Sequence, residues 1–147
     1  MPILLPVLGD PALDAAREIA QAPVLGIAEA AFHCATLISH RFAIVTTMTR
    51  TIATAEHLLN RYGFAAQCSG IYASDIPVLA LEAISPSVYQ QLYQDCKTAI
   101  AQGAETIVLG CGGMAQLADE LRSQLHVPVI DGVRAAVKLA ESLHQLG

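Results

Sequence analysis

Short apolar segments alternate with helical patterns along this chain, and this alternation constrains the fold more than any other feature. The segments that we predict to be strands cover residues 2–7, 23–27, 41–47, 106–110 and 128–130. They show little alternation of polar and apolar residues, which is typical of strands buried on both faces. A weaker sixth strand is predicted within residues 65–73. Strands that alternate with helices predict an α/β fold with a mainly parallel sheet.

Helical patterns fill the intervals between the strands, and several have recognisable ends. The predicted helices cover residues 10–21, 27–40, 49–63, 85–103, 114–125 and 132–147. Asp10 and Ser85 are each followed by proline, a sequence that favours a helix N-terminus with the polar residue as its cap. Gly63 and Gly103 follow helical patterns and predict helix C-terminal ends, with a left-handed conformation at Gly63.

An internal repeat relates residues 6–31 to residues 110–137. Pro23 aligns with Pro128 at an offset of 105, and before a one-residue gap the offset is 104. The earlier offset places Cys111 opposite Val7. The repeat predicts two strand–turn–helix–strand–helix units that face each other. A chance similarity between two alanine-rich units is the alternative.

Composition excludes several classes of protein. Of the 147 residues, 54% are hydrophobic and 14% are charged, with a net charge of −5. These values favour a well-buried globular domain over disorder, and so few surface charges predict a homo-oligomer, a dimer or larger. Without a Lys/Arg cluster, nucleic acid is not an expected partner. No apolar run approaches the roughly 18 residues of a membrane span, and the N-terminal segment lacks signal-peptide features, so we expect no membrane partner and a cytoplasmic location.

The four cysteines match no zinc or CxxC spacing, so we expect free thiols, no metal and no cofactor. Cys34, Cys68 and Cys96 lie within helical or strand patterns and are predicted to pack in the core. His33 and His40 lie on one predicted helix. A helix surface or interface is favoured over a metal pair there, because no carboxylate or thiol completes a ligand set.

Three turns follow predicted strands and precede predicted helices: residues 8–10, 46–49 and 111–113. Ligands of parallel sheets bind beyond the carboxyl ends of the strands. A helix N-terminus there offers free backbone N–H groups and the positive end of the helix dipole. Such an environment suits a carboxylate, an imide oxygen or an enolate, and it favours the thiolate form of a cysteine.

Cys111 is the candidate for chemistry, as a nucleophile or proton shuttle; a small buried residue is the alternative. Two glycines after it allow the backbone to approach a ligand. Thr46 and Thr47, at the end of the third predicted strand, either only favour β structure or donate hydrogen bonds to an oxyanion. Asp10 is either a helix cap or a contact to the substrate. The candidate substrate-binding residues are Gly9, Asp10, Thr46, Thr47, Gly112 and Gly113.

Five segments in order carry a family resemblance: residues 9–19, 23–47, 76–82, 103–121 and 127–141. Together they resemble the hydantoin and allantoin racemase branch of the aspartate/glutamate racemase superfamily. The resemblance implies two pseudo-symmetric flavodoxin-like α/β lobes with the active site between them. It also implies cofactor-independent racemisation by two cysteines on opposite faces of a carbon acid. Cys111, in "GCGGM", matches the second of these cysteines.

The sequence departs from the family pattern at its start. Val7 stands where the family has its first cysteine, two positions before Gly-Asp-Pro, and valine cannot exchange a proton. The family's "Asn-Pro-Asn" strand end and a further βαβα stretch precede the point at which this sequence begins. The resemblance therefore implies a truncated first lobe, made of residues 1–40 and 132–147, and a second lobe made of residues 41–131.

Two functions follow from this reading. The first is racemisation of a small substrate, a hydantoin, allantoin or amino-acid derivative, by proton transfer α to a carbonyl with Cys111 as acid/base. The second is an impaired homologue that binds a ligand or acts as a regulatory dimer, in which a second subunit covers exposed sheet edges.

Overall fold

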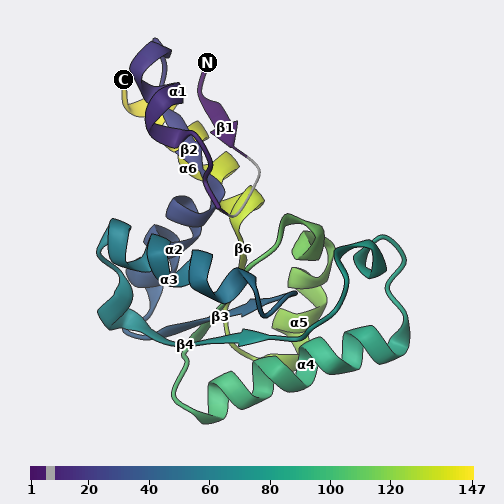
Figure 1. Cartoon of the computed structure of the whole chain (residues 1–147). Helices are drawn as coiled ribbons and strands as arrows, with labels where there is room; N and C mark the ends of the chain where they lie inside the picture. Colours follow the sequence, from purple (N-terminus) through teal and green to yellow (C-terminus); the bar gives the residue numbers. More distant parts are fainter. Residues whose placement is uncertain (6–8) are drawn as a thin grey trace.

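The computed structural model describes residues 1–5 and 9–147, and it contains two parallel sheets (Figure 1). The smaller sheet pairs β1 (Ile3–Leu5) with β2 (Val24–Gly26). The larger has the order β4-β3-β5-β6. Its strands are β3 (Phe42–Thr46), β4 (Cys68–Ala73), β5 (Thr106–Leu109) and β6 (Val129–Asp131). The α/β prediction is confirmed, and a strand lies within or overlaps each predicted segment. Val7 lies outside the described residues.

The described residues also form six α-helices and three short 3-10 helices. The α-helices are α1 (Leu13–Ile19), α2 (Ile27–Ile38), α3 (Thr51–Tyr62), α4 (Pro86–Ala101), α5 (Ala118–Leu125) and α6 (Gly132–Leu146). The 3-10 helices are η1 (Ala65–Gln67), η2 (Val78–Leu81) and η3 (Gly112–Leu117).

Several predicted helix ends are confirmed. The Ser85 hydroxyl accepts a hydrogen bond from the Val88 N–H at 3.3 Å, and Pro86 is the first residue of α4. Gly63 ends α3 with φ of 81°, a conformation that glycine adopts without steric cost.

Two other predicted helix starts are wrong. α1 begins at Leu13 after Ala12, and Asp10 does not cap it. The helix expected from residue 114 is divided, because η3 occupies residues 112–117 and α5 starts only at Ala118. Adjacent glycines weaken the start of a helix, which is consistent with the tighter 3-10 turn there.

Helices cover both faces of the larger sheet (Figure 1). Phe42 and Ile44 of β3 point toward α2 and α3, in a cluster that includes Phe32. Ala43 and Val45 point the other way, into a cluster with residues of α4 and α5. This arrangement explains why β3 is buried along its whole length and why its sequence is almost uniformly apolar.

The smaller sheet forms an arm together with α1 and α6, and both chain termini lie at its tip (Figure 1). α2 follows β2 of the arm but packs on the larger sheet, whereas α6 follows β6 of the larger sheet and packs on the arm. The two helices meet closely at their starts. A Cβ on Gly132 would lie 2.6 Å from the carbonyl oxygen of Ile27, so a side chain there would force the helices apart.

The repeat found in the sequence is reproduced in the strand register. Ile3 pairs with Val24 in the arm, and Ile107 pairs with Val129 in the larger sheet. Ile107 follows Ile3 by 104 positions, and Val129 follows Val24 by 105 positions, which are the two offsets found in the sequence repeat. Side-chain contacts repeat as well: the Arg17 guanidinium donates to the Val24 carbonyl at 3.0 Å, as that of Arg122 does to the Val129 carbonyl at 3.1 Å.

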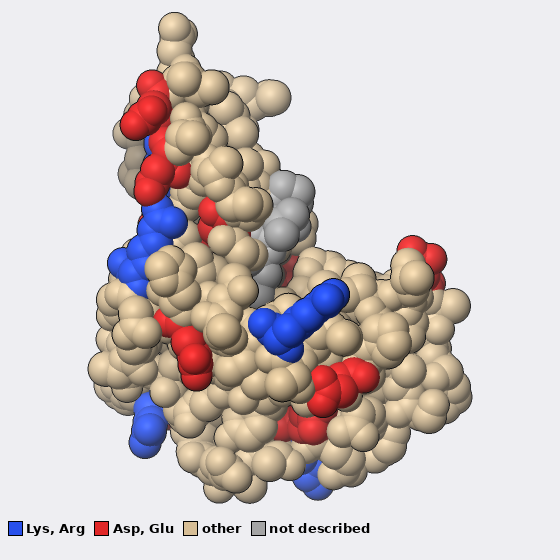
Figure 2. All heavy atoms as spheres, viewed as in Figure 1, with Lys and Arg blue, Asp and Glu red and all other residues tan. Residues whose placement is uncertain are grey.

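The division into residues 1–40 with 132–147 and residues 41–131 stays a prediction. Within the described part of the chain, no helix has the length and apolar character needed to cross a bilayer. Charged side chains are scattered over the face seen in Figure 2, and most of that surface is neither acidic nor basic.

Candidate active site

A cavity of about 660 Å³ opens at the carboxyl ends of β3 and β5, where the predicted turns converge. Strands β3 and β5 are hydrogen-bonded neighbours and end side by side. The described residues that line the cavity are Gly9, Thr47, Thr51, Thr54, Val78, Gly110, Cys111, Gly112, Gly113 and Val133. The cavity therefore brings together at least one residue from each of the three turns that the sequence singled out.

Close packing at Gly110 places the turn that contains Cys111. The Gly110 N–H donates to the Val45 carbonyl at 2.7 Å, which continues the β3–β5 ladder beyond β5. A Cβ at Gly110 would lie 2.8 Å from the Cβ of Thr46 and 3.1 Å from Cγ2 of Ile44. Only glycine fits this close approach without displacing the strand end, so Gly110 fixes where the following thiol lies.

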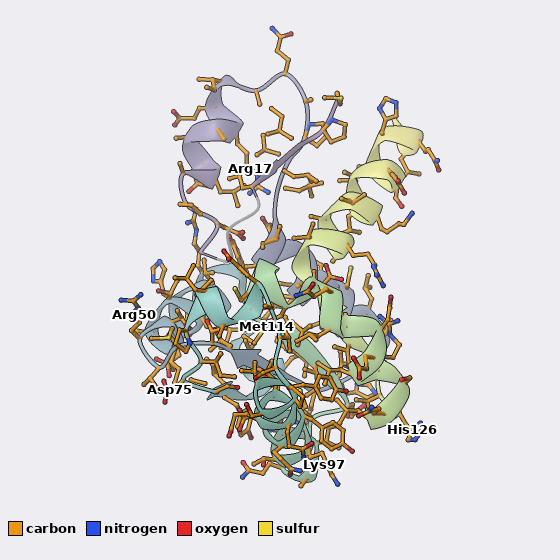
Figure 3. All side chains as sticks on the ribbon, turned by 90° about the vertical axis from the view of Figure 1, so that its right-hand side faces the viewer. Arg17, Arg50, Asp75, Lys97, Met114 and His126 are labelled. Atoms are coloured by element: carbon orange, nitrogen blue, oxygen red, sulfur yellow. The ribbon has the colours of Figure 1, made fainter. Side chains whose placement is uncertain are left out.

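Cys111 is half-buried and has an extended backbone, and its carbonyl accepts from the Met114 N–H at 3.0 Å. Figure 3 shows Met114 near the middle of the molecule, below the arm that carries Arg17. The sequence predicts an α-helix N-terminus beside the thiol, which the structure does not have. The structure has the six-residue η3 there, and α5 begins further along the chain, so the dipole of a long helix does not act on Cys111.

The threonines at the end of β3 play different parts. Thr47 lines the cavity, and its hydroxyl makes no hydrogen bond to another described side chain. Thr46 is fully buried and does not line the cavity. Its hydroxyl instead lies 2.9 Å from the hydroxyl of Thr51, which donates to the Met48 carbonyl at 2.6 Å. Thr46 therefore supports the start of α3.

Gly9 lines the cavity but the adjacent Asp10 does not. The Asp10 side chain is buried and caps α2: its carboxylate accepts from the backbone N–H groups of Ala28 at 3.1 Å and Glu29 at 3.0 Å, and from the Tyr62 hydroxyl at 2.7 Å. Burial raises the pKa of the Asp10 carboxyl, and these three hydrogen bonds oppose the rise. Burial beside Asp10 also raises the pKa of Tyr62.

Five lining residues were not predicted from the sequence: Thr51, Thr54, Val78, Gly110 and Val133. Thr51 and Thr54 lie three positions apart on the first turn of α3, a spacing that puts them on one face. That spacing was a usable signal once the preceding turn had been chosen. Val78 comes from the connection between β4 and α4, and no local pattern predicts where that connection folds.

The other three thiols are placed less favourably for chemistry. Cys96 is fully buried, and burial raises the pKa of its thiol to about 12. Burial also raises the pKa of Cys34 and of Cys68. All four cysteines are free, as predicted. Within residues 1–5 and 9–147, no three His, Cys, Asp or Glu side chains group as a metal site.

The model of the Asp/Glu/hydantoin racemase family matches residues 3–140. The chain is 48% identical over 135 residues to the hydantoin racemase of Rhizobium meliloti and 42% identical over 140 residues to that of Pseudomonas sp. (strain NS671). These alignments cover 91% and 95% of this chain but 56% of each relative, so the chain spans little more than half their length.

Solved structures agree with this relationship. Allantoin racemase from Klebsiella pneumoniae superposes with a TM-score of 0.95 at 53% identity, covering 99% of this chain and 60% of that one. Glutamate racemase RacE1 from Bacillus anthracis has a TM-score of 0.71 at 21% identity and shares the fold alone. The chain is thus an α/β protein with a cavity at its strand ends, and it belongs to the Asp/Glu/hydantoin racemase family. Within that family it is similar to the hydantoin and allantoin racemases.

Proposed function

We propose that this protein catalyses cofactor-independent proton transfer at a carbon α to a carbonyl, in hydantoin, allantoin or a related amino-acid derivative. Cys111 is the acid/base group in this proposal. The observation that carries it is the position of Cys111 on the cavity, where it is the one ionisable side chain among the described lining residues. The cavity volume of about 660 Å³ falls in the range of small-molecule sites.

The proposed step is a reversible deprotonation. The Cys111 thiolate removes the proton from the ring carbon, and the electrons of that C–H bond move into the adjacent carbonyl to form an enolate. The thiol then returns a proton to the same carbon, so no bond to sulfur other than S–H is formed. The Thr47 hydroxyl and the backbone N–H groups of Gly112 and Gly113 are donors that these lining residues offer to the enolate oxygen.

A single thiol serves one face of the substrate carbon. Inversion by two bases needs a second acid/base group opposite Cys111, and the described lining residues supply none. Pro6, Val7 and Leu8 have no ionisable side chain either. We therefore expect this chain alone to exchange the α-proton faster than it inverts the configuration.

The test follows one enantiomer of a 5-substituted hydantoin, and in parallel one enantiomer of allantoin, in D₂O. Optical rotation reports inversion, and the NMR signal of the α-proton reports exchange, each corrected for the reaction without protein. The proposal expects exchange that outpaces loss of rotation and that falls about 10²–10⁴-fold in Cys111→Ser. Cys34→Ser is the matched control, because its thiol does not line this cavity.

The same assay addresses the alternative function. An impaired homologue that only binds its ligand would shift the NMR spectrum of the protein on addition of the hydantoin without exchanging the α-proton. Exchange above the uncatalysed rate would exclude that alternative, whereas binding without exchange would contradict the catalytic proposal.

A further inference from the structure

The connection between β4 and α4, residues 74–85, folds over the Cys111 turn and is fixed at its start. The Ile76 N–H donates to the Thr47 carbonyl at 3.0 Å. The Asp75 carboxylate accepts from both the backbone N–H and the hydroxyl of Thr49, at 3.0 and 2.6 Å. Figure 3 shows Asp75 on the same edge of the molecule as Arg50, the residue after Thr49. The beginning of the connection is therefore attached to the end of β3.

The far end of the connection rests on the turn that carries the thiol. The Gln116 side-chain amide, from η3, donates to the Leu81 carbonyl at 2.9 Å. Leu81 is only 3% exposed, and its Cδ1 atom lies 3.1 Å from the place that a Cβ on Gly113 would occupy. A Cβ at Gly113 would crowd the end of the Leu81 side chain, so the glycine allows Leu81 to lie in close contact with this turn.

Between these two attachments, η2 presents one apolar side chain to the cavity. Val78 lines the cavity together with Cys111 and is 50% exposed. The adjacent Leu79 is 76% exposed and is not among the lining residues. Val133, at the start of α6, supplies a second apolar side chain to the same cavity from a different element.

We propose that Val78 is a specificity-determining residue that contacts the substituent on the reacting carbon, and that Gln116 is a positioning residue that acts through η2. The inference rests on the proposed function for the chemical class of the ligand, a 5-substituted hydantoin. The other described lining residues are glycines, threonines, Cys111 and Val133, so among them Val78 and Val133 are the large apolar contacts for a hydrocarbon group.

The size of the effect follows from the side chain. Val78→Ala removes two methyl groups, each of which strengthens binding about four-fold when fully buried against a ligand. Because Val78 is half-exposed in the free protein, we expect about half of this gain to be realised, or roughly a four-fold change in the dissociation constant for a ligand whose substituent reaches it.

The experiment compares 5-methylhydantoin with 5-isopropylhydantoin by calorimetric or NMR titration, which requires no turnover. In Val78→Ala, the preference for the isopropyl ligand should fall about four-fold, whereas Leu79→Ala should retain the wild-type preference. Thermal unfolding of each variant checks that it is folded. Equal preferences in the wild type, Val78→Ala and Leu79→Ala would overturn the proposal.

A double-mutant comparison tests Gln116 separately. Gln116→Ala should lower the isopropyl preference in the wild-type background and have no further effect in Val78→Ala, since both changes act on one contact. Gln116→Lys keeps a donor of sufficient length at an exposed position and should restore the preference. A residue that only stabilises the fold would shift both ligands equally and show no dependence on Val78.

The outcomes separate this inference from the proposed function. A shifted preference without α-proton exchange would support the role of Val78 and contradict the role of Cys111. Exchange of the α-proton with an unchanged ligand preference in Val78→Ala would support the role of Cys111 and contradict that of Val78. Failure of the wild-type protein to bind any of these hydantoins would contradict both.

Discussion

The substitution Asp10→Asn distinguishes two roles for this acidic residue beside the cavity: stabilising the fold or contacting the substrate. Its carboxylate Oδ1 accepts from the Ala28 N–H, and Oδ2 accepts from the Glu29 N–H and the Tyr62 hydroxyl. Asp10→Asn preserves the shape but replaces one acceptor oxygen by an NH₂ group. In either orientation of the amide, that NH₂ group faces a backbone N–H, which then lacks an acceptor.

The magnitude comes from two costs and one gain that opposes them. A buried donor left without a partner costs about 1–3 kcal/mol, and loss of negative charge at a helix N-terminus costs about 0.3–1 kcal/mol. Burial, however, raises the pKa of Asp10, which means that desolvation destabilises the charged carboxylate. Replacing the carboxylate by a neutral amide removes this desolvation cost and offsets part of the lost stability. We therefore expect a net destabilisation of about 1–2 kcal/mol, or about 2–8 °C in the melting temperature of a chain of this size.

Thermal and urea unfolding measure this loss, and Asp14→Asn is the matched control. Asp14 is exposed and pairs with Arg61, and such surface pairs are worth about 0–1 kcal/mol. The reasoning would be refuted if Asp10→Asn left stability unchanged and instead abolished binding of the hydantoin. That result would assign Asp10 to the substrate, as the sequence analysis allowed.

Three further predictions follow from the same structure. Gly110→Ala should destabilise the protein by about 1–3 kcal/mol and slow α-proton exchange, because the new methyl group overlaps Thr46; unfolding and exchange assays measure the two effects. Alkylation by iodoacetamide, mapped by mass spectrometry, should modify Cys111 first and Cys96 last, since Cys96 is buried with a pKa raised to about 12; equal rates would contradict the site assignment. Two arginines lower the pKa of Asp119 to about 2, so its stabilising contribution should be present above about pH 4 and lost as the pH falls toward 2. Melting curves of wild type and Asp119→Asn should accordingly converge at low pH.

Local signals were sufficient to predict the elements of the fold. The strands are nearly continuous apolar runs because the sheet is covered on both faces, and β3 is the clearest case. Ser85 and Gly63 mark helix ends through interactions within a few residues of themselves, so a short stretch of sequence contains the whole reason for each. The repeat predicted two similar strand–helix units, and the structure shows that the first strand of each unit pairs with the second in an equivalent register.

Interactions between distant segments were not predictable in this way. The local sequence predicted Asp10 as the cap of the helix that follows it, but Asp10 caps α2 instead. The pairing of β1 with β2 brings the N-terminus of α2 close to Asp10. Gly26 makes this possible, since a Cβ there would lie 2.2 Å from the Asp10 carboxyl carbon. The hydrogen bond from the Gln116 amide to the Leu81 carbonyl likewise joins residues 35 positions apart. Such contacts depend on the assembled fold and leave no periodic pattern in the sequence.

The rate of deuterium incorporation at the α-carbon, compared between Cys111→Ser and Cys34→Ser, tests the central claim most directly. If the Cys111 thiol beside β5 moves the substrate proton, the rate of deuterium incorporation should be that of wild type in Cys34→Ser. It should fall about 100-fold or more in Cys111→Ser. Undiminished incorporation in a folded Cys111→Ser protein would show that another group performs the proton transfer, and the assignment of Cys111 would be wrong.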